Sequence, residues 1–362
     1  MHRFATLTIG LFLLCSITAT ALPKFASRMN LSCQSCHVNP TGGGLRNTYG
    51  VSYGQEDLPI PTWQEDFTLD LMTTQINDVI TVGANFRTLY FSQQTGPTTS
   101  RNSFFQMQSD LYLSARLAKK TLIYLNKGLG ARFEAFGLAG ILPLDGYVKV
   151  GWFVPNFGIR ADDHNIFTRD KTLFAFGGGH DAGVELGFSP DILNFTVGLT
   201  NGSLGDRDDN SFKALMARGE ARVRVGGINL RGGGSYYNNA HPAGVLTLLG
   251  VHGIATIGNN LTVLGEFVQR RTFVNTTGVK TYSSILYVEA DYLLMQGIDL
   301  KVGYEFYDPD TKYLSGSESR LVFGAEFYPV SGIELRPLYV LRMEKPTDSP
   351  NDQLILMMHF YL

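Results

Sequence analysis

From about residue 66 to the carboxyl terminus, apolar and polar residues alternate with a period of two. The clearest run is 298–306, where Ile, Leu, Val, Tyr and Phe alternate with Asp, Lys, Gly and Glu. The same split recurs over 215–225 and 333–342. A period of two places one set of side chains on each face of a β-strand, so the pattern predicts an all-β fold.

Alternation alone does not separate a soluble β-sandwich from a membrane barrel, but two further features favour the barrel. The polar face carries full charges of both signs, as expected of strands that line a wet lumen and face lipid on the other side. Tight turns also alternate with longer polar loops, as in outer-membrane barrels. The predicted turns are 189–191, 226–227, 258–260, 296–297 and 329–332, and the predicted loops are 156–180, 201–211, 308–317 and 344–352.

The carboxyl end agrees with a barrel, because residues 354–362 alternate to the last position, as terminal strands of outer-membrane barrels do. Alternating segments number about 16, a size that leaves a channel. The count is ambiguous between 67 and 140, where 121–137 reads either as one long strand or as a hairpin around 127–130. The predicted fold is thus a transmembrane antiparallel β-barrel of about 16 strands over residues 66–362.

The first 21 residues have the form of a secretory signal peptide. Arg3 precedes an apolar stretch from Phe4 to Ile17, and Ala19-Thr20-Ala21 supplies the small residues of a cleavage site. The mature chain is then expected to begin at Leu22. A lipoprotein signal at Cys15 is the alternative, disfavoured because Leu14 before it is not small. No later run of 18 apolar residues could form a spanning helix.

Residues 22–65 have no sustained periodicity and carry the one cysteine motif of the mature chain, Cys33-Gln34-Ser35-Cys36-His37. This spacing is that of a haem c site, in which both thiols attach to the porphyrin and the next imidazole ligates the iron. A redox disulfide is disfavoured because no βαβ pattern surrounds the motif. A zinc site is disfavoured because no other Cys or His lies between Leu22 and Asp163.

We therefore expect one covalent haem c, held by Cys33, Cys36 and His37, with His37 as the metal ligand. The sixth ligand is left unassigned, because each candidate is more simply an ordinary residue of its segment or strand. The candidates are Met29, Met72, His252 and His359. The triple glycine 42–44 would let the chain pass close to the haem edge or the wall, although a plain flexible turn is the simpler interpretation.

In this layout the chain resembles the fused monohaem cytochrome-porins of outer membranes, whose relatives include extracellular iron oxidases. The resemblance covers the signal, Pro23-x-Phe25-Ala26, the haem motif, the Gly and Arg segment 42–50 and the barrel that follows. The barrel is compact for that family, and the triple glycine replaces its usual Phe-Gly-Arg stretch. The resemblance implies electron transfer between a periplasmic carrier, such as a cytochrome, and an extracellular donor or acceptor, with iron as a candidate.

Residues 146–158 separately resemble phosphate-selective-type porins. In that reading Lys149, Arg218, Arg222 and Arg224 face the lumen and attract anions, whereas the simpler reading pairs them with acidic neighbours such as Glu220. The resemblance thus keeps open a diffusion porin in which the haem is structural or regulatory.

The chain is expected to lie in the outer membrane, in contact with its lipid, with the haem segment inside the barrel. A soluble periplasmic cytochrome fused to a β-sandwich is the remaining alternative. A net charge of -2, with both signs interspersed, argues against nucleic acid as a partner. No constellation for hydrolysis is present, so any enzymatic activity would be that of an oxidoreductase.

Two acidic groups in the long loops are candidate metal sites, although such loops are usually only solvated. They are Asp162, Asp163 and His164, and Asp206, Asp208 and Asp209.

Overall fold

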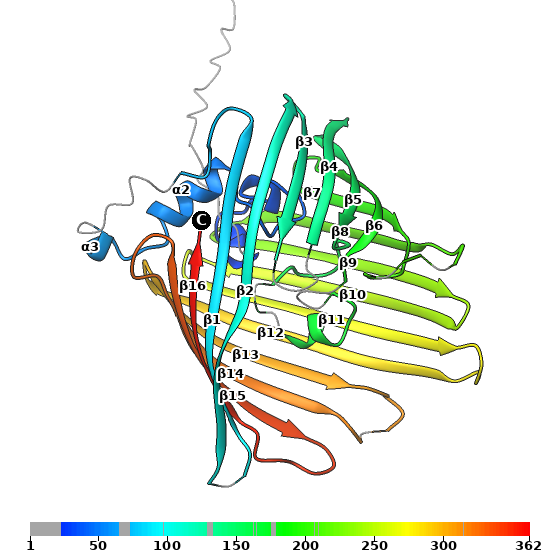
Figure 1. Ribbon diagram of the computed structural model, residues 1–362. Coiled ribbons are helices and arrows are strands. Elements are labelled where there is room, and N and C mark those ends of the chain that lie inside the picture. The colour runs from blue at the N-terminus through cyan, green and yellow to red at the C-terminus, as the bar shows by residue number, and fades with distance from the viewer. Residues whose placement is uncertain are drawn as a thin grey trace, which may run out of the picture.

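The computed structural model describes residues 23–64, 73–96, 98–128, 133–161, 163, 165–174, 179–205, 207–208, 210–313 and 315–362. In these residues sixteen antiparallel strands close into a barrel, each beside its neighbours in sequence and β1 beside β16 (Figure 1). The strands are β1 (Ile80–Gln94), β2 (Ser100–Ala118), β3 (Thr121–Lys127), β4 (Phe133–Leu142), β5 (Gly146–Phe153), β6 (Asp181–Phe188), β7 (Leu193–Thr200), β8 (Ala214–Val225), β9 (Ile228–His241), β10 (Gly244–Ile257), β11 (Leu261–Val274), β12 (Lys280–Met295), β13 (Ile298–Asp308), β14 (Glu318–Phe327), β15 (Ile333–Glu344) and β16 (Gln353–Tyr361). Short helical elements are α1 (Pro23–Arg28), the 3₁₀ turn η1 (Cys33–Ser35), α2 (Thr48–Glu56), α3 (Pro61–Gln64) and α4 (Phe167–Asp170).

The predicted fold class is confirmed, and the β-sandwich alternative is wrong. Closure is made by β1 and β16, which pair from Asn85 with Tyr361 to Gln93 with Gln353. A closed sheet leaves no free edge, so every strand can satisfy its backbone inside a bilayer. In the described part of the chain, no helix is long and apolar enough to cross a membrane.

The outer surface of the barrel is apolar and the inner surface is polar, as the alternation predicts. Leu300 and Val302 on β13 are 43% and 48% exposed, whereas Lys301 between them is 4% exposed. Asp299 and Glu305 on the same strand also point inward and are buried. Strands with this division face lipid outside and a polar lumen inside.

Turns and loops divide between the two ends of the barrel. All five predicted tight turns lie at one end, which we call the short-turn rim, and all four predicted longer loops lie at the other, the long-loop rim. One hairpin departs from this rule, because only residues 242–243 join β9 to β10 at the long-loop rim.

Two details near the start of the barrel differ from or sharpen the prediction. Of the two interpretations of residues 121–137, the hairpin is the one observed, since β3 ends at Lys127 and β4 begins at Phe133. In the described residues the first strand begins at Ile80, after turns and an isolated bridge over 73–79. The boundary placed at 66, the signal peptide 1–21 and Leu22 lie outside the described residues.

Two segments of the described chain enter the lumen. The first belongs to the amino-terminal segment, residues 23–64, of which residues 23–47 pack inside the barrel. Its helices α2 and α3 lie at the rim where the carboxyl terminus lies (Figure 1). Helix α2 of this segment contacts the last strand, since Tyr361 Oη donates to the carbonyl of Gly54 at 3.1 Å. The second is the lumen loop, made of the described residues 154–161, 163, 165–174 and 179–180 between β5 and β6.

The lumen loop brings apolar side chains into the barrel. Phe157, Phe167 and Phe174 pack against inward-facing apolar residues of β8 to β12. Those wall residues are Ala214, Met216, Tyr237, Leu248, Val268 and Ile285. Burial of aromatic side chains against apolar walls is a strong driving force, so this contact holds the loop inside the barrel.

Candidate functional site

Helix α1 is attached to the barrel wall by buried ion pairs. Lys24 Nζ lies 2.8 Å from Asp291 on β12 and 2.6 Å from Glu326 on β14, and Arg28 Nη1 lies 3.1 Å from Asp299 on β13. Burial by itself would lower the pKa of Lys24, but the two carboxylates outweigh it and hold that pKa above its ordinary value. Lys24 is therefore charged, and its pairs fix α1 at the short-turn rim.

Strand residues next to these pairs hold the chain that leads from α1 to the cysteine motif. Asn229 donates to the carbonyls of Ser27 at 2.9 Å and Arg28 at 2.8 Å, and Arg231 donates to that of Leu31. A buried carbonyl requires such a donor, so these contacts favour one path for the chain. That path brings Cys33 into the lumen.

The Cys33–His37 motif forms a compact turn. Cys36 N and His37 N both donate to the carbonyl of Cys33, at 3.2 and 3.1 Å. Cys33 is half-buried, while Cys36 is completely buried and His37 is nearly so. Burial, and after it the neighbouring Cys33, raises the pKa of the Cys36 thiol to about 12. As a free thiol Cys36 is therefore protonated at neutral pH.

A reversal of the chain after the motif presses it against the barrel wall. His37 pairs with Arg46 across an isolated bridge, and Val38 N donates to the carbonyl of Leu45 at 3.0 Å. Leu45 is fully buried among Tyr112, Tyr124, Phe136 and Phe153 of β2 to β5. The three predicted haem residues thus lie inside the barrel, as expected.

The triple glycine makes this reversal sterically possible. Gly42, Gly43 and Gly44 all have positive φ, at 88°, 77° and 66°. A Cβ at Gly42 would lie 3.2 Å from Cys33 Cβ, and one at Gly44 only 2.1 Å from Tyr124 Oη. The three glycines therefore form an ordered turn. It brings the backbone close to the motif at Gly42 and close to the wall at Gly44.

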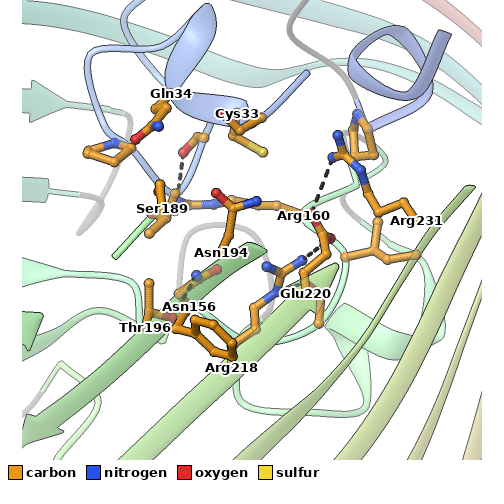
Figure 2. Close-up of a pocket in the computed structure, with 18 of the residues that line it drawn as sticks. Cys33, Gln34, Asn156, Arg160, Ser189, Asn194, Thr196, Arg218, Glu220 and Arg231 are labelled. Carbon is orange, nitrogen blue, oxygen red and sulfur yellow. Dashed lines mark hydrogen bonds and ion pairs between the residues drawn. The ribbon is translucent and has the colours of Figure 1, made fainter. Parts of the chain in front are cut away.

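A small cavity opens beside Cys33, between the amino-terminal segment, the lumen loop and the wall from β5 to β10 (Figure 2). Its lining combines three arginines, Arg160, Arg218 and Arg231, with one acid, Glu220. Apolar surface comes from Tyr147, Ile159, Phe195 and Ile254. Cys36 and His37 are not in this lining.

Cofactor sites typically combine apolar walls with a few polar groups. The described lining has apolar side chains and cationic side chains beside Cys33, but the cavity is too small for a porphyrin as these side chains stand. A haem held by Cys33, Cys36 and His37 would also need Cys36 and His37 to reach it.

Arg160 joins the lumen loop to the haem motif. Its Nη1 donates to Thr41 Oγ1 at 3.1 Å and to the carbonyl of Gly42 at 2.7 Å. A charged donor shared between two acceptors makes a strong contact. The lumen loop is thus fixed to the chain that packs directly on Cys33.

The sixth-ligand candidates are placed in different surroundings. His252 Nε2 lies 3.1 Å from Arg218 Nη2 and 3.2 Å from Glu220 Oε2, next to the cavity. His359 contacts Glu334 and Asn85, and Met29 lies just after α1. Met72 lies outside the described residues. The ligand therefore stays unassigned.

The predicted anion-attracting row is largely neutralised by neighbours. Lys149 is fully buried 2.7 Å from Glu185, and Arg218 lies 2.7 Å from Glu220. Arg222 donates to the carbonyl of Asp191 at the short-turn rim, where Arg224 is exposed. Lys149 and Arg218 thus fit the interpretation that these cations are paired with acidic neighbours.

The loop acids show ion pairs where the structure describes them. Asp163 contacts Lys301 at 2.9 Å and also Arg336, while Asp208 contacts Lys213 at 2.6 Å. Asp162, His164, Asp206 and Asp209 lie outside the described residues. Among the residues described, no group of three or more His, Cys, Asp and Glu side chains has the arrangement of a metal site.

Solved outer-membrane porins share the architecture of this barrel. OmpT of Vibrio cholerae is 12% identical, with a TM-score of 0.59 over 80% of this chain and 100% of that one. An anion-selective porin of Comamonas acidovorans is 10% identical, with a TM-score of 0.55 over 78% and 99% of the two chains. OmpF of Salmonella typhi is 12% identical, with a TM-score of 0.55 over 80% and 100%.

No protein-family model matches the chain, and no curated protein matches it. At such low identity, the likeness to porins shows the fold. The closed barrel and its apolar exterior agree with that fold, and the predicted outer-membrane location and lipid contact are confirmed.

Sequence reasoning missed two cavity arginines, Arg160 and Arg231. Arg231 could have been found by extending the strand alternation, because it faces inward on β9. Arg160 lies in a loop without periodicity, so no local signal marks it. Lys24 and Arg28 were also missed, because their partners are more than 260 residues away.

Proposed function

We propose that this protein carries electrons across the outer membrane through one haem c, attached to Cys33 and Cys36 and ligated by His37 inside the barrel. The observation that carries the proposal is the enclosure of the motif in the lumen, where Cys36 and His37 are buried and Leu45 packs on the wall. A haem c bound there would supply one-electron redox chemistry.

The residues of the chain have separate roles in this proposal. Cys33 and Cys36 attach the group, and His37 holds its iron. The buried pairs of Lys24 and Arg28 hold the motif in the lumen. The wall from β5 to β10 and the lumen loop separate the cavity from lipid. Placed near the short-turn rim, the motif is within reach of a periplasmic electron carrier.

Exchange with an extracellular donor or acceptor would take place across the long-loop rim. Iron is the candidate substrate, on the resemblance to cytochrome-porins alone. The lumen loop lies between the cavity and that rim, and its aromatic residues Phe157 and Phe174 stack at 5.3 Å between ring centroids. This packing excludes water from part of the path.

The test uses the mature protein in liposomes that contain a trapped reductant, with an acceptor outside. The parent should show a haem stain that survives denaturing electrophoresis and should reduce the external acceptor. The double variant Cys33→Ser/Cys36→Ser should lose both properties and keep its heat-modifiable gel mobility, which reports a folded barrel. Equal electron transfer by parent and double variant would refute the proposal.

A diffusion porin is the second candidate, favoured by the fold shared with porins, one of which is named as anion-selective. The same liposomes discriminate between the two functions. A parent that conducts ions and small solutes freely, and passes no electrons, is a porin in which any haem is structural or regulatory.

A further inference from the structure

The charged side chains that line the small cavity are mostly arginines. They are Arg160 from the lumen loop, Arg218 on β8 and Arg231 on β9, with Glu220 on β8 as the one acid among the described lining residues (Figure 2). Glu220 is shared, because it lies 2.7 Å from Arg218 and 3.5 Å from Arg231. His252, which contacts Arg218 and Glu220, adds no negative charge. The strand wall therefore has two guanidinium groups and one carboxylate.

Arg160 has an acid of its own, so it leaves this excess unchanged. Its Nη2 lies 3.7 Å from Glu134 on β4, and Glu134 also lies 3.8 Å from His180. With Glu134 included, the described charges at the cavity are three cations and two acids. A positive charge that is shielded from water and lacks a counter-ion is costly. At least one positive charge at the cavity is therefore not compensated by a side chain of the described residues.

Uncharged donors lie in the same lining. Asn156 Nδ2 donates to Thr196 Oγ1 at 3.0 Å, so the hydroxyl proton of Thr196 is available to another acceptor. Thr196 lies directly opposite Arg218 in the pairing of β7 with β8, and opposed side chains of neighbouring strands are close together. Asn194 Nδ2 is buried and has no hydrogen-bond partner among the residues that the structure describes. An anion in the cavity would supply the missing acceptor.

The size and charge of the cavity restrict the class of anion. It has room for little more than water-sized groups, so a porphyrin does not fit as these side chains stand. One uncompensated positive charge matches a monovalent anion. Chloride is monovalent, is only slightly larger than a water molecule, and accepts hydrogen bonds from guanidinium, amide and hydroxyl groups. Those groups are the donors in this lining.

Two of the arginines also hold the amino-terminal segment on the wall. Arg160 Nη1 donates to Thr41 Oγ1 and to the carbonyl of Gly42, at 3.1 and 2.7 Å, and Arg231 donates to the carbonyl of Leu31. Repulsion between like charges is strong in a site of low dielectric, so it opposes the positions in which the arginines make these contacts. An anion among the arginines would remove that repulsion.

We propose that one chloride ion binds in this cavity beside Arg218 and Thr196 and stabilises the docking of the amino-terminal segment. The ion supplies the counter-charge that Glu220 alone cannot give to two arginines. The site lies where both lumen segments pack on the wall, so it differs from the attraction of anions into an open pore. None of the haem residues is a ligand of the ion, so the test is independent of the test of electron transfer.

Three variants test the site. Arg218→Gln removes the excess cation, so docking should no longer depend on chloride. Thr196→Asp places a carboxylate opposite Arg218 and should have the same effect while every arginine is kept, so it decides the test if Arg218→Gln does not fold. Arg224→Gln is the matched control, since it makes the same charge change as Arg218→Gln at an exposed position of β8 outside the cavity lining. Heat-modifiable mobility shows that each variant is folded.

Limited proteolysis of the purified protein, as expressed, measures docking. At constant ionic strength, cleavage within residues 23–47 should be several-fold slower in sodium chloride than in sodium gluconate, whose anion is too large for the cavity. The protection should saturate as chloride is raised. Arg224→Gln should keep this difference, whereas Arg218→Gln and Thr196→Asp should lose it. Equal cleavage of the parent in the two salts would overturn the proposal, as would an undiminished chloride effect in either cavity variant.

Bromide, which has the charge of chloride and nearly its size, locates the ion directly. Crystals of the parent and of Arg224→Gln grown with bromide should show one anomalous-scattering peak in the cavity. The peak should be absent from Arg218→Gln and Thr196→Asp. A parent cavity without bromide would contradict the proposal. A peak without chloride protection in solution would also overturn it, as binding at crystal concentration only.

Discussion

Gly44 marks the closest approach of the amino-terminal segment to the barrel wall. Its φ is 66°, and a Cβ there would lie 2.1 Å from Tyr124 Oη, the atom that accepts a hydrogen bond from Leu45 N at 3.3 Å. Both the backbone conformation and the lack of space therefore exclude a side chain. Leu45, which is fully buried on this wall, depends on that approach.

We expect Gly44→Ala to weaken the docking of residues 38–47 by about 1–3 kcal/mol. Gly226→Ala is the control, because Gly226 also has a positive φ, of 57°, but nothing lies within 4 Å of a Cβ there. Limited proteolysis of folded protein measures the difference as faster cleavage in the amino-terminal segment. Equal cleavage of the two variants would show that the wall contact contributes nothing.

A second prediction at this scale concerns Cys36. Because the second thioether also helps to position His37, Cys36→Ser should weaken or abolish the covalent haem stain. Ser331→Ala, a buried change at the short-turn rim outside the cavity lining, should leave the stain unchanged. The stain is read after denaturing electrophoresis of protein expressed with a working haem-maturation system. Full staining of Cys36→Ser would contradict the assigned attachment.

The motif could be predicted from sequence because its three residues are contiguous and their spacing is itself the chemical requirement. The wall around it could be predicted only in part. Arg231 and Glu220 follow from the alternation along β8 and β9, which the predicted turn at 226–227 makes neighbours. Arg160 reaches Gly42 across 118 residues of chain, and local sequence does not specify such a contact.

At the scale of elements, the strands follow closely from the alternation, because the period of two directly records which face meets lipid. Strand β13 agrees residue by residue, with Leu300 outside and Lys301 inside. The pattern was ambiguous where strands are short, as for β3 with its seven residues. Alternation also predicts only that a residue faces inward, whereas the structure shows which partners each inward side chain contacts.

Lys301 illustrates that distinction. It lies within 3.2 Å of three carboxylates, those of Asp163, Glu289 and Glu326, which join β13 to its neighbouring strands and to the lumen loop. We expect Lys301→Met to cost about 3–5 kcal/mol, because it removes the cation that these three buried acids share. Asp163 and Glu326 keep Arg336 as a partner. Denaturant unfolding monitored by gel mobility measures the change.

The outward residue Val302, near the middle of β13, tests lipid contact. Val302→Arg should cost about 2–4 kcal/mol, since a charge must leave water. Val302→Ile is the control and should be nearly neutral. A benign Val302→Arg in refolded, bilayer-inserted protein would contradict the assignment of this face to lipid.

At the scale of the whole molecule, a 16-strand barrel is wide enough to enclose a channel, yet this lumen contains two inserted segments. The amino-terminal segment occupies the short-turn end, and the lumen loop packs across the wall from β8 to β12. Sequence predicted that the haem segment enters the lumen, on the argument that one haem outside the barrel could not serve an external partner. It predicted the loop 156–180 but not its entry into the lumen, because the residues of the loop have no periodicity.

The last prediction follows from what holds the amino-terminal segment in place. Lys24 and Arg28 pair with Asp291, Glu326 and Asp299 on the wall, all of them buried. Lys24→Met/Arg28→Met removes both cations, at a cost of about 3–5 kcal/mol for a single broken pair. Asp291 and Asp299 lose these partners, whereas Glu326 keeps Lys301 and Arg336. The segment should then leave the lumen for part of the time.

Single-channel recording in planar bilayers measures this release. We expect the parent to show low conductance for its strand number, and Lys24→Met/Arg28→Met to show several-fold higher conductance with frequent transitions. Lys119→Met/Lys120→Met, which removes two exposed lysines from a short turn of the same rim, is the matched control and should behave like the parent. If the parent is already as conductive as the variant, the segment does not close the barrel, and the lumen serves diffusion as well as any electron transfer.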